Sequence, residues 1–452
     1  MLPQTKPSKK TIYLDHAATT PLNPRVKKVM EPFWSDYFGN PSALYKKGRE
    51  ATNAIAVARK TIAEILNSRA DEIIFTAGGS ESINLAILGV ARAFRLINKT
   101  GGHIIATVIE HHAVLHSLDA LKQEGFEVTL LEVDQNGFIN LDALKSEIRP
   151  DTILISVMYA NNEIGTIEPI FEIGKLLKAI NEERITKKLP KIFFHTDACQ
   201  AAGSLELDIQ KLNVDLLSAN GSKMYGPKQT GFLYVRNGVK LRPIIFGGGQ
   251  ERNLRSGTEN VAGVVGLAES LKLAQQGRVK ENKRLQTLRD YFMNQIQKHI
   301  PKIVFNGPDD RKTKPDPKKI NGGMKRLPNN INVSILDIEG EALLLYLDSY
   351  NIAMSTGSAC TSTSLDPSHV ILAIGRPYEY AHGSMRFTLG KSTTKQDINY
   401  VMKVLPGIVA ELRRISPVNL NPAKPEEVSM EKAFIGENMT KFRNKKTVQK
   451  PK

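Results

Sequence analysis

The chain has 452 residues, of which 41% are hydrophobic and 24% are charged, and only two are cysteines. This composition is ordinary for a globular protein without a disulfide framework, and the length favours two domains over one. The sequence contains neither a run of about 18 apolar residues nor an N-terminal apolar segment, so we expect no membrane span and no secretory signal. Two cysteines suit a reducing compartment, and we expect the protein in the cytoplasm.

The net charge of +16 is concentrated in three stretches. Residues 1–11 carry three lysines, residues 309–326 carry seven Lys or Arg against three Asp, and residues 417–452 carry eight Lys or Arg against four Glu. Aromatic residues are not interleaved with these basic residues. The pattern therefore favours solvated tails and a solvated loop over a nucleic-acid surface, and we expect no direct nucleic-acid binding.

Between Ile73 and Val235, short β-branched or aromatic runs alternate with amphipathic helical patterns such as "SESINLAILGVARAF". The runs are "EIIFTAG", "HIIATVIE", "EVTLLEV", "TILISVMY", "KIFFHTDA", "VDLLSAN" and "GFLYVR". This alternation predicts an α/β fold, in which a large domain holds a mostly parallel seven-stranded sheet flanked by helices. Ligands of such sheets bind at the carboxyl ends of the strands.

A second, smaller α+β unit follows. A helical region near residues 261–300 leads into "IVFNG", "NNINVSI" and the helix candidate "IEGEALLLYLDSY". We expect a large domain over residues 12–265 and a small C-terminal domain over residues 266–416, on which residues 1–20 pack. Residues 417–452 are expected to form a basic, flexible tail.

Two charged residues follow buried strands of the predicted sheet. Asp197 ends the strand of "FFHTDACQ", and Lys223 follows the strand of "SANGSKMYGP". Pyridoxal phosphate needs such a pair, because a carboxylate keeps its pyridine nitrogen protonated and a lysine forms its Schiff base. Gly79 and Ser80 in "FTAGGSES" stand where a strand meets a helix N-terminus and could hold the phosphate, although an ordinary helix cap has the same pattern.

Three histidines and two asparagines follow other strands. His112 and His116 in "VIEHHAVLHSL" have a spacing compatible with a metal site, but no third ligand is evident and we predict no metal. We expect His111 to stack on the cofactor, and the other two histidines to face solvent. Asn161 and Asn162 in "MYANNEIGT" offer hydrogen-bonding side chains, with turn formation as the alternative.

At this point ten motifs, in order and spacing, resemble the NifS/IscS-type cysteine desulfurases. These enzymes belong to the class V aminotransferase group of pyridoxal-phosphate fold type I. The resemblance covers residues 11–416. The motifs are "YLDHAATTP", "FGNPSALY", "FTAGGSESINLAI", "EHHAV", "NNEIG", "TDACQ", "GSKMYGP", "RSGTEN", "STGSACTS" and "AHGSMRFTLG".

The resemblance implies a role for each matching residue. Lys223 resembles the Schiff-base lysine, Asp197 the partner of the pyridine nitrogen, and Gln200 a hydrogen-bond partner of the ring hydroxyl. His111 matches the stacked histidine, which is also a proton-transfer candidate. Asn162 matches the asparagine that binds both cofactor and substrate.

The same resemblance extends to the phosphate and to the substrate carboxylate. Gly79 and Ser80 match the phosphate cup. Arg386 in "MRFTLG" matches the arginine that grips the substrate carboxylate, a task suited to the bidentate guanidinium fork. Thr258 in "RSGT" aligns with a residue that reaches the phosphate of the neighbouring subunit, which implies a homodimer.

Cys360, in "STGSACTSTSL", matches the family's nucleophile. The resemblance implies that its thiolate attacks the sulfur of L-cysteine, leaving L-alanine and a persulfide on Cys360. The persulfide would pass to an iron-sulfur scaffold protein or other acceptors, with tRNA thiolation as a further option, and Cys360 is a candidate transient ligand of an iron-sulfur cluster. Cys199 lies in an apolar segment, and we interpret it as a packing residue.

The chain departs from the family pattern beside the lysine. Ser222 stands where the family usually has His in "GHK", and Asn220 stands where a Ser is common. Both family positions contact the cofactor phosphate. Because Ser and Asn remain hydrogen-bond donors, we predict a retained cofactor site with altered phosphate contacts. The basic stretch 309–326 is also longer than the usual family segment.

Two other functions remain open from the sequence. The first is a selenocysteine lyase or another class V lyase, against which the thiol of Cys360 argues. The second is a basic RNA-binding or scaffold protein with a decayed site, for which Ser222 is the support.

Overall fold

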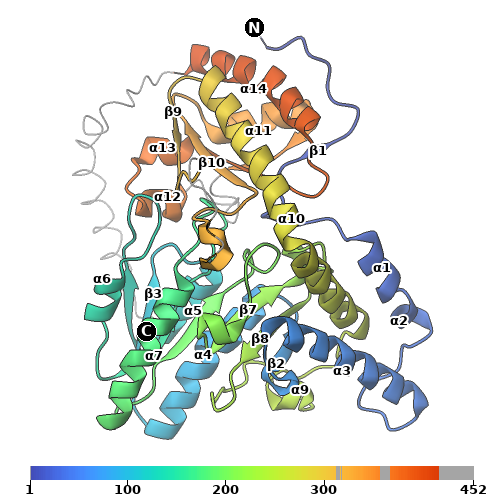
Figure 1. The fold of residues 1–452 in the computed structure, drawn as a ribbon, viewed down its shortest axis with the longest axis vertical. Coiled ribbons are helices and arrows are strands. Elements are labelled where there is room, and N and C mark those ends of the chain that lie inside the picture. Colours follow the sequence, from blue (N-terminus) through green and yellow to red (C-terminus); the bar gives the residue numbers. More distant parts are fainter. Residues whose placement is uncertain (1, 312–315, 317, 357–366, 417–452) are drawn as a thin grey trace, which may run out of the picture.

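The computed structural model describes residues 2–311, 316, 318–356 and 367–416 (Figure 1). Its central sheet has seven strands in the order β2-β8-β7-β6-β5-β3-β4, and each of the seven predicted runs supplies one of them. The strands are β2 (Ile73–Thr76), β3 (His103–Thr107), β4 (Glu127–Leu131), β5 (Thr152–Ser156), β6 (Phe193–Asp197), β7 (Leu216–Asn220) and β8 (Gly231–Val235). Only β8 runs antiparallel to its neighbours, so the predicted mostly parallel sheet is confirmed.

Both faces of this sheet are covered by helices. Successive strand residues point to opposite sides, so Ile104 joins one apolar cluster and Ile105 the other, and neither is exposed to solvent. Helices α4 (Gly79–Asn98) and α5 (His112–Gln123) cover the first side, whereas α3 (Lys46–Leu66) and α7 (Ile170–Thr186) cover the second. Burial on both faces explains why these strands read as continuous apolar runs.

A second core is built on the four-stranded antiparallel sheet β12-β13-β10-β9. Its strands are β9 (Ile303–Phe305), β10 (Asn330–Ile335), β12 (Ser355–Thr356) and β13 (Ser384–Thr388), and it packs with α11 (Gly340–Ser349) and α14 (Lys395–Ile415). The N-terminal segment joins this core, because β1 (Ile12–Tyr13) pairs with β11 (Ile352–Ala353). The shorter helices are α1 (Pro24–Met30), α2 (Pro32–Ser35), α6 (Leu141–Ser146), α8 (Ile209–Leu212), α9 (Gln250–Asn253), α12 (His369–Ala373) and α13 (Tyr378–His382), with 3₁₀ turns η1 (Ala70–Glu72), η2 (Gly221–Lys223) and η3 (Ile320–Gly323).

One helix of 39 residues, α10 (Val261–His299), runs through both cores (Figure 1). Leu267 and Leu271 of this helix pack in the core of the large sheet, whereas Phe292 and Ile296 pack in the second core. The domain boundary expected between residues 265 and 266 therefore falls inside a continuous helix, and the division of the chain into domains stays a prediction. In the described part of the chain, none of the helices has the length and apolar character that a membrane crossing requires.

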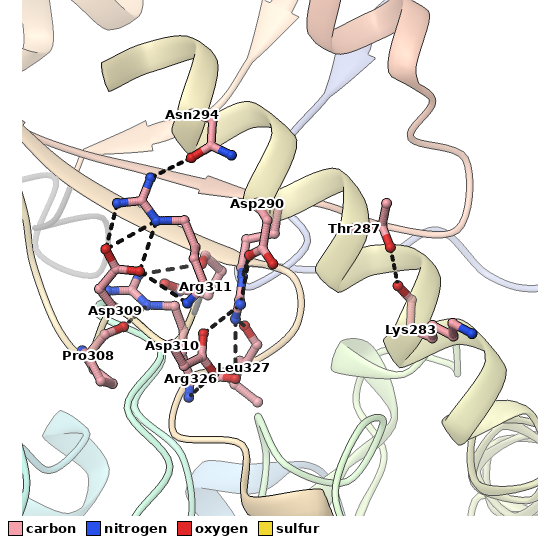
Figure 2. Close-up of polar contacts among 12 residues, drawn as sticks. Lys283, Thr287, Asp290, Asn294, Pro308, Asp309, Asp310, Arg311, Arg326 and Leu327 are labelled. Atoms are coloured by element: carbon pink, nitrogen blue, oxygen red, sulfur yellow. Dashed lines mark hydrogen bonds and ion pairs between the residues drawn. The ribbon is translucent and has the colours of Figure 1, made fainter. Parts of the chain in front are cut away.

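The expectation that the basic stretch 309–326 forms a solvated loop is wrong for two of its residues, Asp310 and Arg326, which are buried. Figure 2 shows the polar contacts around them. Arg289 donates to Asp310, with 2.6 Å between Nη2 and Oδ1, and the Arg326 backbone N–H donates weakly to the other oxygen of Asp310 at 3.4 Å. Burial, reinforced by the neighbouring Arg289, lowers the pKa of Arg326 to about 9. The expectation failed because the partner of Asp310 lies on α10, 21 residues earlier in the chain.

Candidate active site

The carboxyl ends of the parallel strands meet at one edge of the large sheet, where a cavity of about 350 Å³ opens. Strand β6 ends at Asp197, and its neighbour β7 ends at Asn220, three residues before Lys223. The nine predicted site residues that line this cavity are Gly79, Ser80, His111, Asn162, Asp197, Gln200, Asn220, Lys223 and Arg386. Arg386 lies on β13 of the second core, and the others lie at or after the ends of β2, β3, β5, β6 and β7. These segments are far apart in the sequence, and the fold brings them together.

The lysine and the carboxylate are held by backbone groups. Lys223 Nζ donates to the carbonyl oxygens of Ala17 at 2.8 Å and Ala18 at 2.5 Å, both in the N-terminal segment. The buried Asp197 accepts a hydrogen bond from the backbone N–H of Cys199, with 2.9 Å to Oδ1. The backbone thus fixes one oxygen of Asp197 in a turn directly after its strand.

His111 is the N-cap of α5, and its ring nitrogen Nδ1 accepts the backbone N–H of Ala113 at 3.1 Å. An accepting Nδ1 leaves the ring proton of a neutral imidazole on Nε2. Burial lowers the pKa of His111, and the nearby Asp197 only partly opposes this shift. His111 is therefore neutral at pH 7, with Nε2 as its donor.

The end of the cavity formed by the first turn of α4 is shaped for an anion. Ser80 and the free backbone amides of this turn line it, and an α-helix N-terminus favours negative charge. A Cβ added to Gly79 would lie 2.6 Å from Cys199 Sγ and 3.2 Å from Asn220 Nδ2, so only glycine fits there. Asn220 Oδ1 is buried and has no hydrogen-bond partner within the described residues.

Arg386 enters the cavity from β13, and its side chain is only 2% exposed. Its Nη2 pairs with Asp15 Oδ1 at 2.9 Å, and its Nη1 donates to the carbonyl oxygen of Asn162 at 3.2 Å. Its Nε is buried without a partner in the described part of the chain. The guanidinium thus still has an N–H to offer a carboxylate ligand.

Some sequence-predicted site residues are not placed at the cavity. Ser222 does not line it, and its carbonyl oxygen accepts hydrogen bonds from the backbone and hydroxyl of Thr20, at 2.8 and 2.9 Å. Thr258 is exposed and also lies outside the lining. Cys360 falls outside the described residues. The roles assigned to these three residues stay predictions.

The expectation that His112 and His116 face solvent holds for His116 but only in part for His112, which is half-buried. Its ring lies 4.8 Å from the ring of His369 and 5.1 Å from that of His116, and only His116 is exposed. The contact joins residues more than 250 positions apart, so no local pattern could reveal it. Among the residues described, no three His, Cys, Asp or Glu side chains are grouped as metal ligands.

The sequence analysis missed the contribution of the N-terminal segment and misjudged one cysteine. Asp15, Ala17 and Ala18 surround the lysine and the arginine, and the only signal was that they belong to the quoted motif "YLDHAATTP". Cys199 is buried, as a packing residue would be, but it also lines the cavity wall. Burial, together with Asp197, raises the pKa of its thiol, so the thiol stays protonated.

A sheet of this topology, with a lysine and a carboxylate at its carboxyl edge, defines a pyridoxal-phosphate enzyme of fold type I. The family model that matches residues 12–401 is aminotransferase class-V. The chain is 48% identical over 409 residues to a cysteine desulfurase IscS of Clostridium botulinum, covering 90% of this chain and 97% of that protein. A cysteine desulfurase IscS of Dictyoglomus turgidum is 49% identical with the same coverage.

Solved structures agree with these relatives. A NifS-like protein superimposes with a TM-score of 0.78 at 33% identity, covering 89% of this chain and all of that one. A structure described as SspA in complex with cysteine has a TM-score of 0.68 at 36% identity, covering 84% of this chain and 99% of that one. The chain therefore belongs to the class V aminotransferase family, and within it to the NifS/IscS-type cysteine desulfurases.

Enzymes of this family depend on pyridoxal phosphate, and the cavity fits this cofactor. Its anion-binding end offers the backbone amides in the first turn of α4 and the side-chain NH2 group of Asn220, and glycine at position 79 leaves that end open. Asp197 and Lys223 supply the carboxylate and the amine that the cofactor needs. Bound there, pyridoxal phosphate supplies an electron-accepting ring.

Proposed function

We propose that this chain removes the sulfur atom of L-cysteine, releasing L-alanine and leaving a persulfide on Cys360. The observation that supports it most is the convergence of Lys223, Asp197 and Arg386 on one cavity of about 350 Å³. These are an amine, a carboxylate and a guanidinium, the groups that pyridoxal phosphate and an amino-acid substrate require. The identity of 47 to 49% to proteins named cysteine desulfurase points to the same reaction.

The cofactor would be held by residues from four strand ends. Asp197 would pair with the pyridine nitrogen, and Gln200 with the ring hydroxyl. Gly79, Ser80 and Asn220 would bind the phosphate, with Ser222 contributing a further contact, and Lys223 would be the covalent anchor. His111 would lie against the ring, where its neutral state avoids repulsion with a protonated pyridine nitrogen.

The substrate would be oriented by Arg386 and Asn162. The guanidinium would bind the carboxylate of L-cysteine, and the Asn162 side chain would contact both substrate and cofactor. Once its amine is free, Lys223 can move a proton at the substrate, and His111 Nε2 is the second candidate for proton transfer. The Cys360 thiolate would attack the substrate sulfur, so that an S–S bond forms and the substrate C–S bond breaks.

The partners belong to the same proposal. Thr258 would reach the phosphate of the neighbouring subunit in a homodimer, and its exposure in the single chain is compatible with that role. The persulfide would pass to an iron-sulfur scaffold protein, with tRNA thiolation as a further use, and Cys360 would be a transient cluster ligand at most. The two-cysteine composition supports a cytoplasmic location.

The test is to add pyridoxal phosphate and L-cysteine to the full chain and to assay sulfide and alanine together, in the presence of a reductant. We expect the visible absorption band of the lysine-bound cofactor and equal amounts of the two products, with Lys223→Ala losing both. Cys360→Ala should lose desulfuration of cysteine. If Cys360→Ala keeps its activity on selenocysteine but loses its activity on cysteine, the desulfurase proposal stands. If Cys360→Ala stays active on both substrates, a lyase is favoured.

A further inference from the structure

Glu163 has a buried carboxyl group that lies outside the cavity. It follows Asn162 in the turn after β5, its side chain does not line the cavity, and only 6% of the residue is exposed. Burial raises its pKa to about 7, and its carboxylate accepts a hydrogen bond from the hydroxyl of Ser368. Buried carboxyl groups are costly, so this contact calls for a structural or functional reason.

Ser368 connects this carboxyl to a short helix. Its hydroxyl donates to Glu163 and accepts the backbone N–H of Ile371 at 3.2 Å, which caps α12. Val370 and Ile371 of this helix pack in a small apolar cluster with Met158, at the end of β5. Ser368 is the second described residue after the stretch 357–366, which contains Cys360.

The other end of that stretch is held by the strand that carries Arg386. Strand β12, Ser355–Thr356, pairs with β13, and Ser355 lies opposite Arg386. The described residues on the two sides of the stretch 357–366 are therefore both fixed, since Ser355 lies opposite the arginine of the cavity and Ser368 is hydrogen-bonded to Glu163.

Asn162 and Glu163 also hold the arginine strand. The carbonyl oxygen of Asn162 accepts Nη1 of Arg386 at 3.2 Å. The carbonyl oxygen of Glu163 accepts the side-chain amides of Asn330 and Asn332 on β10, at 3.0 and 3.2 Å, and Asn332 is paired with Arg386 across the sheet. One two-residue turn thus touches the cavity, the second-core sheet that carries Arg386, and Ser368, which follows the stretch 357–366.

We propose that Glu163 is a positioning residue for sulfur transfer, which acts through Ser368 to fix the segment that follows residues 357–366 relative to the substrate held by Arg386. The inference rests on the proposed function, because the reaction needs the Cys360 sulfur within reach of the substrate sulfur. Since Glu163 does not line the cavity, its loss should affect the attack by Cys360 more than the binding of cysteine.

Steady-state kinetics of the cofactor-loaded full chain provide the first test. We expect Glu163→Ala to lower kcat by roughly ten- to a hundredfold, since misplacement by about 1 Å can cost that much, with KM for L-cysteine within about twofold of the parent. Glu163→Gln keeps an acceptor for Ser368 and should retain most of the activity. Glu168→Ala is the matched control, because Glu168 is equally buried but accepts from the backbone of Ile139.

A double-mutant cycle separates positioning from general damage to the fold. If Glu163 acts through Ser368, then Ser368→Ala should lower kcat like Glu163→Ala, and the double variant should lose no more than either single variant. Ser368→Thr keeps both the hydroxyl and the helix cap and should restore activity. Additive losses in the double variant, or a rise in KM that matches the loss in kcat, would overturn the proposal.

A readout independent of turnover is the rate at which iodoacetamide alkylates Cys360, followed by peptide mass spectrometry in the reduced protein. We expect several-fold faster alkylation in Glu163→Ala and Ser368→Ala than in the parent, and an unchanged rate in Glu168→Ala. Equal rates in all four proteins would contradict the inference. A parent that makes neither sulfide nor alanine would refute the proposed function, yet the alkylation rates would still decide whether Glu163 holds this chain.

Discussion

Arg386 and Asp15 form an ion pair of 2.9 Å that joins strand β13 to the N-terminal segment at the edge of the cavity. The pair leaves the guanidinium partly charge-compensated before any carboxylate ligand arrives. Arg386 Nη2 donates to Asp15 Oδ1. A carboxylate that bound side-on to the guanidinium would need this same Nη2 together with Nε. A substrate carboxylate must therefore share Arg386 with Asp15 or displace it.

We predict that Asp15→Asn lowers KM for L-cysteine by roughly two- to tenfold, because it removes a like charge beside the incoming carboxylate while keeping the shape of the side chain. Initial rates over a range of cysteine concentrations measure this effect. Arg386→Lys is the comparison and should raise KM, since an ammonium group cannot form the bidentate pair. A higher KM in Asp15→Asn would mean that Asp15 mainly orients the arginine.

Gly79→Ala should weaken binding of pyridoxal phosphate by roughly ten- to a hundredfold. The added methyl would lie 2.6 Å from Cys199 Sγ at the anion-binding end, and overpacking of this kind costs about 1–3 kcal/mol. Fluorescence titration of the apoprotein with the cofactor gives the dissociation constant. The double variant Gly79→Ala/Cys199→Ala removes the clashing sulfur and should recover most of the affinity. If it does not, Asn220, 3.2 Å from the same position, is the stricter constraint.

Asp310→Asn should destabilise the protein by about 1.5–3 kcal/mol, because the buried guanidinium of Arg289 loses one charged hydrogen-bond partner but keeps the carboxylate of Asp290 at 2.8 Å. Urea denaturation followed by circular dichroism measures the loss. The matched control is Asp309→Asn, which removes a carboxylate paired with Arg311 at 2.5 Å but 46% exposed. That change should cost no more than about 1 kcal/mol. Equal losses in the two variants would show that burial of the pair does not matter.

Glu110 should make the stability of the protein depend on pH. It is fully buried, and burial raises its pKa from 4.5 to about 8. The folded state therefore binds this proton more tightly than the unfolded chain. Its stabilising contribution is fully present below about pH 4.5 and is lost as the pH rises through about 8, by at most about 1.4 kcal/mol per pH unit.

Glu110→Gln removes this titration but keeps an oxygen that can accept from Thr107 Oγ1 and the Met158 backbone N–H, both at 2.8 Å in the parent. We expect the melting temperature of the variant, relative to the parent, to rise steadily between about pH 5 and pH 8. Thermal melts at several pH values check this. A constant difference between the two proteins would show that Glu110 stays ionised when folded.

An exposed apolar surface around α2 should be buried in the proposed homodimer. Trp34 and Phe38 are each 66% exposed, and Leu44 and Tyr45 are 90% and 64% exposed, far more than isolated surface side chains require. Light scattering should show a dimer, and Leu44→Asp should convert it to monomer. Val279→Asp, at a 78% exposed position on α10, is the control and should leave the dimer intact. Trp34 is the sole tryptophan, so its fluorescence should shift to the red in the monomer.

The sequence predicted the large sheet well, because strands buried on both faces appear as short continuous apolar runs. It could not predict that β8 is antiparallel, since direction depends on the connection and not on the run itself. It also could not predict the ion pair between Arg386 and Asp15, 371 residues apart, or the burial of Asp310. Charge in a sequence says nothing about which partner will neutralise it.

The candidate site was predicted mainly from motifs, and nine of its residues do line one cavity. The residues that support them were not recognised, because they act through backbone atoms. The carbonyl groups of Ala17 and Ala18 hold Lys223, and any side chain at those positions could offer the same oxygen. Hydrogen bonds of this kind leave no pattern in residue types.

Helix α10 is about 58 Å long at 1.5 Å per residue, and among the elements that the structure describes it is the one that packs in both cores. Its first half packs in the core that also holds the strand ending at Asp197, and in its second half Phe292 contacts Phe387 of the strand that carries Arg386. Helix α10 thus links the core behind the residue that would hold the cofactor to the core behind the residue that would hold the substrate, in addition to the hydrogen bonds that the Asn162–Glu163 turn makes with the second core. A bend of the helix near Gly277, where an added Cβ would meet no atom within 4 Å, would shift these two residues relative to each other.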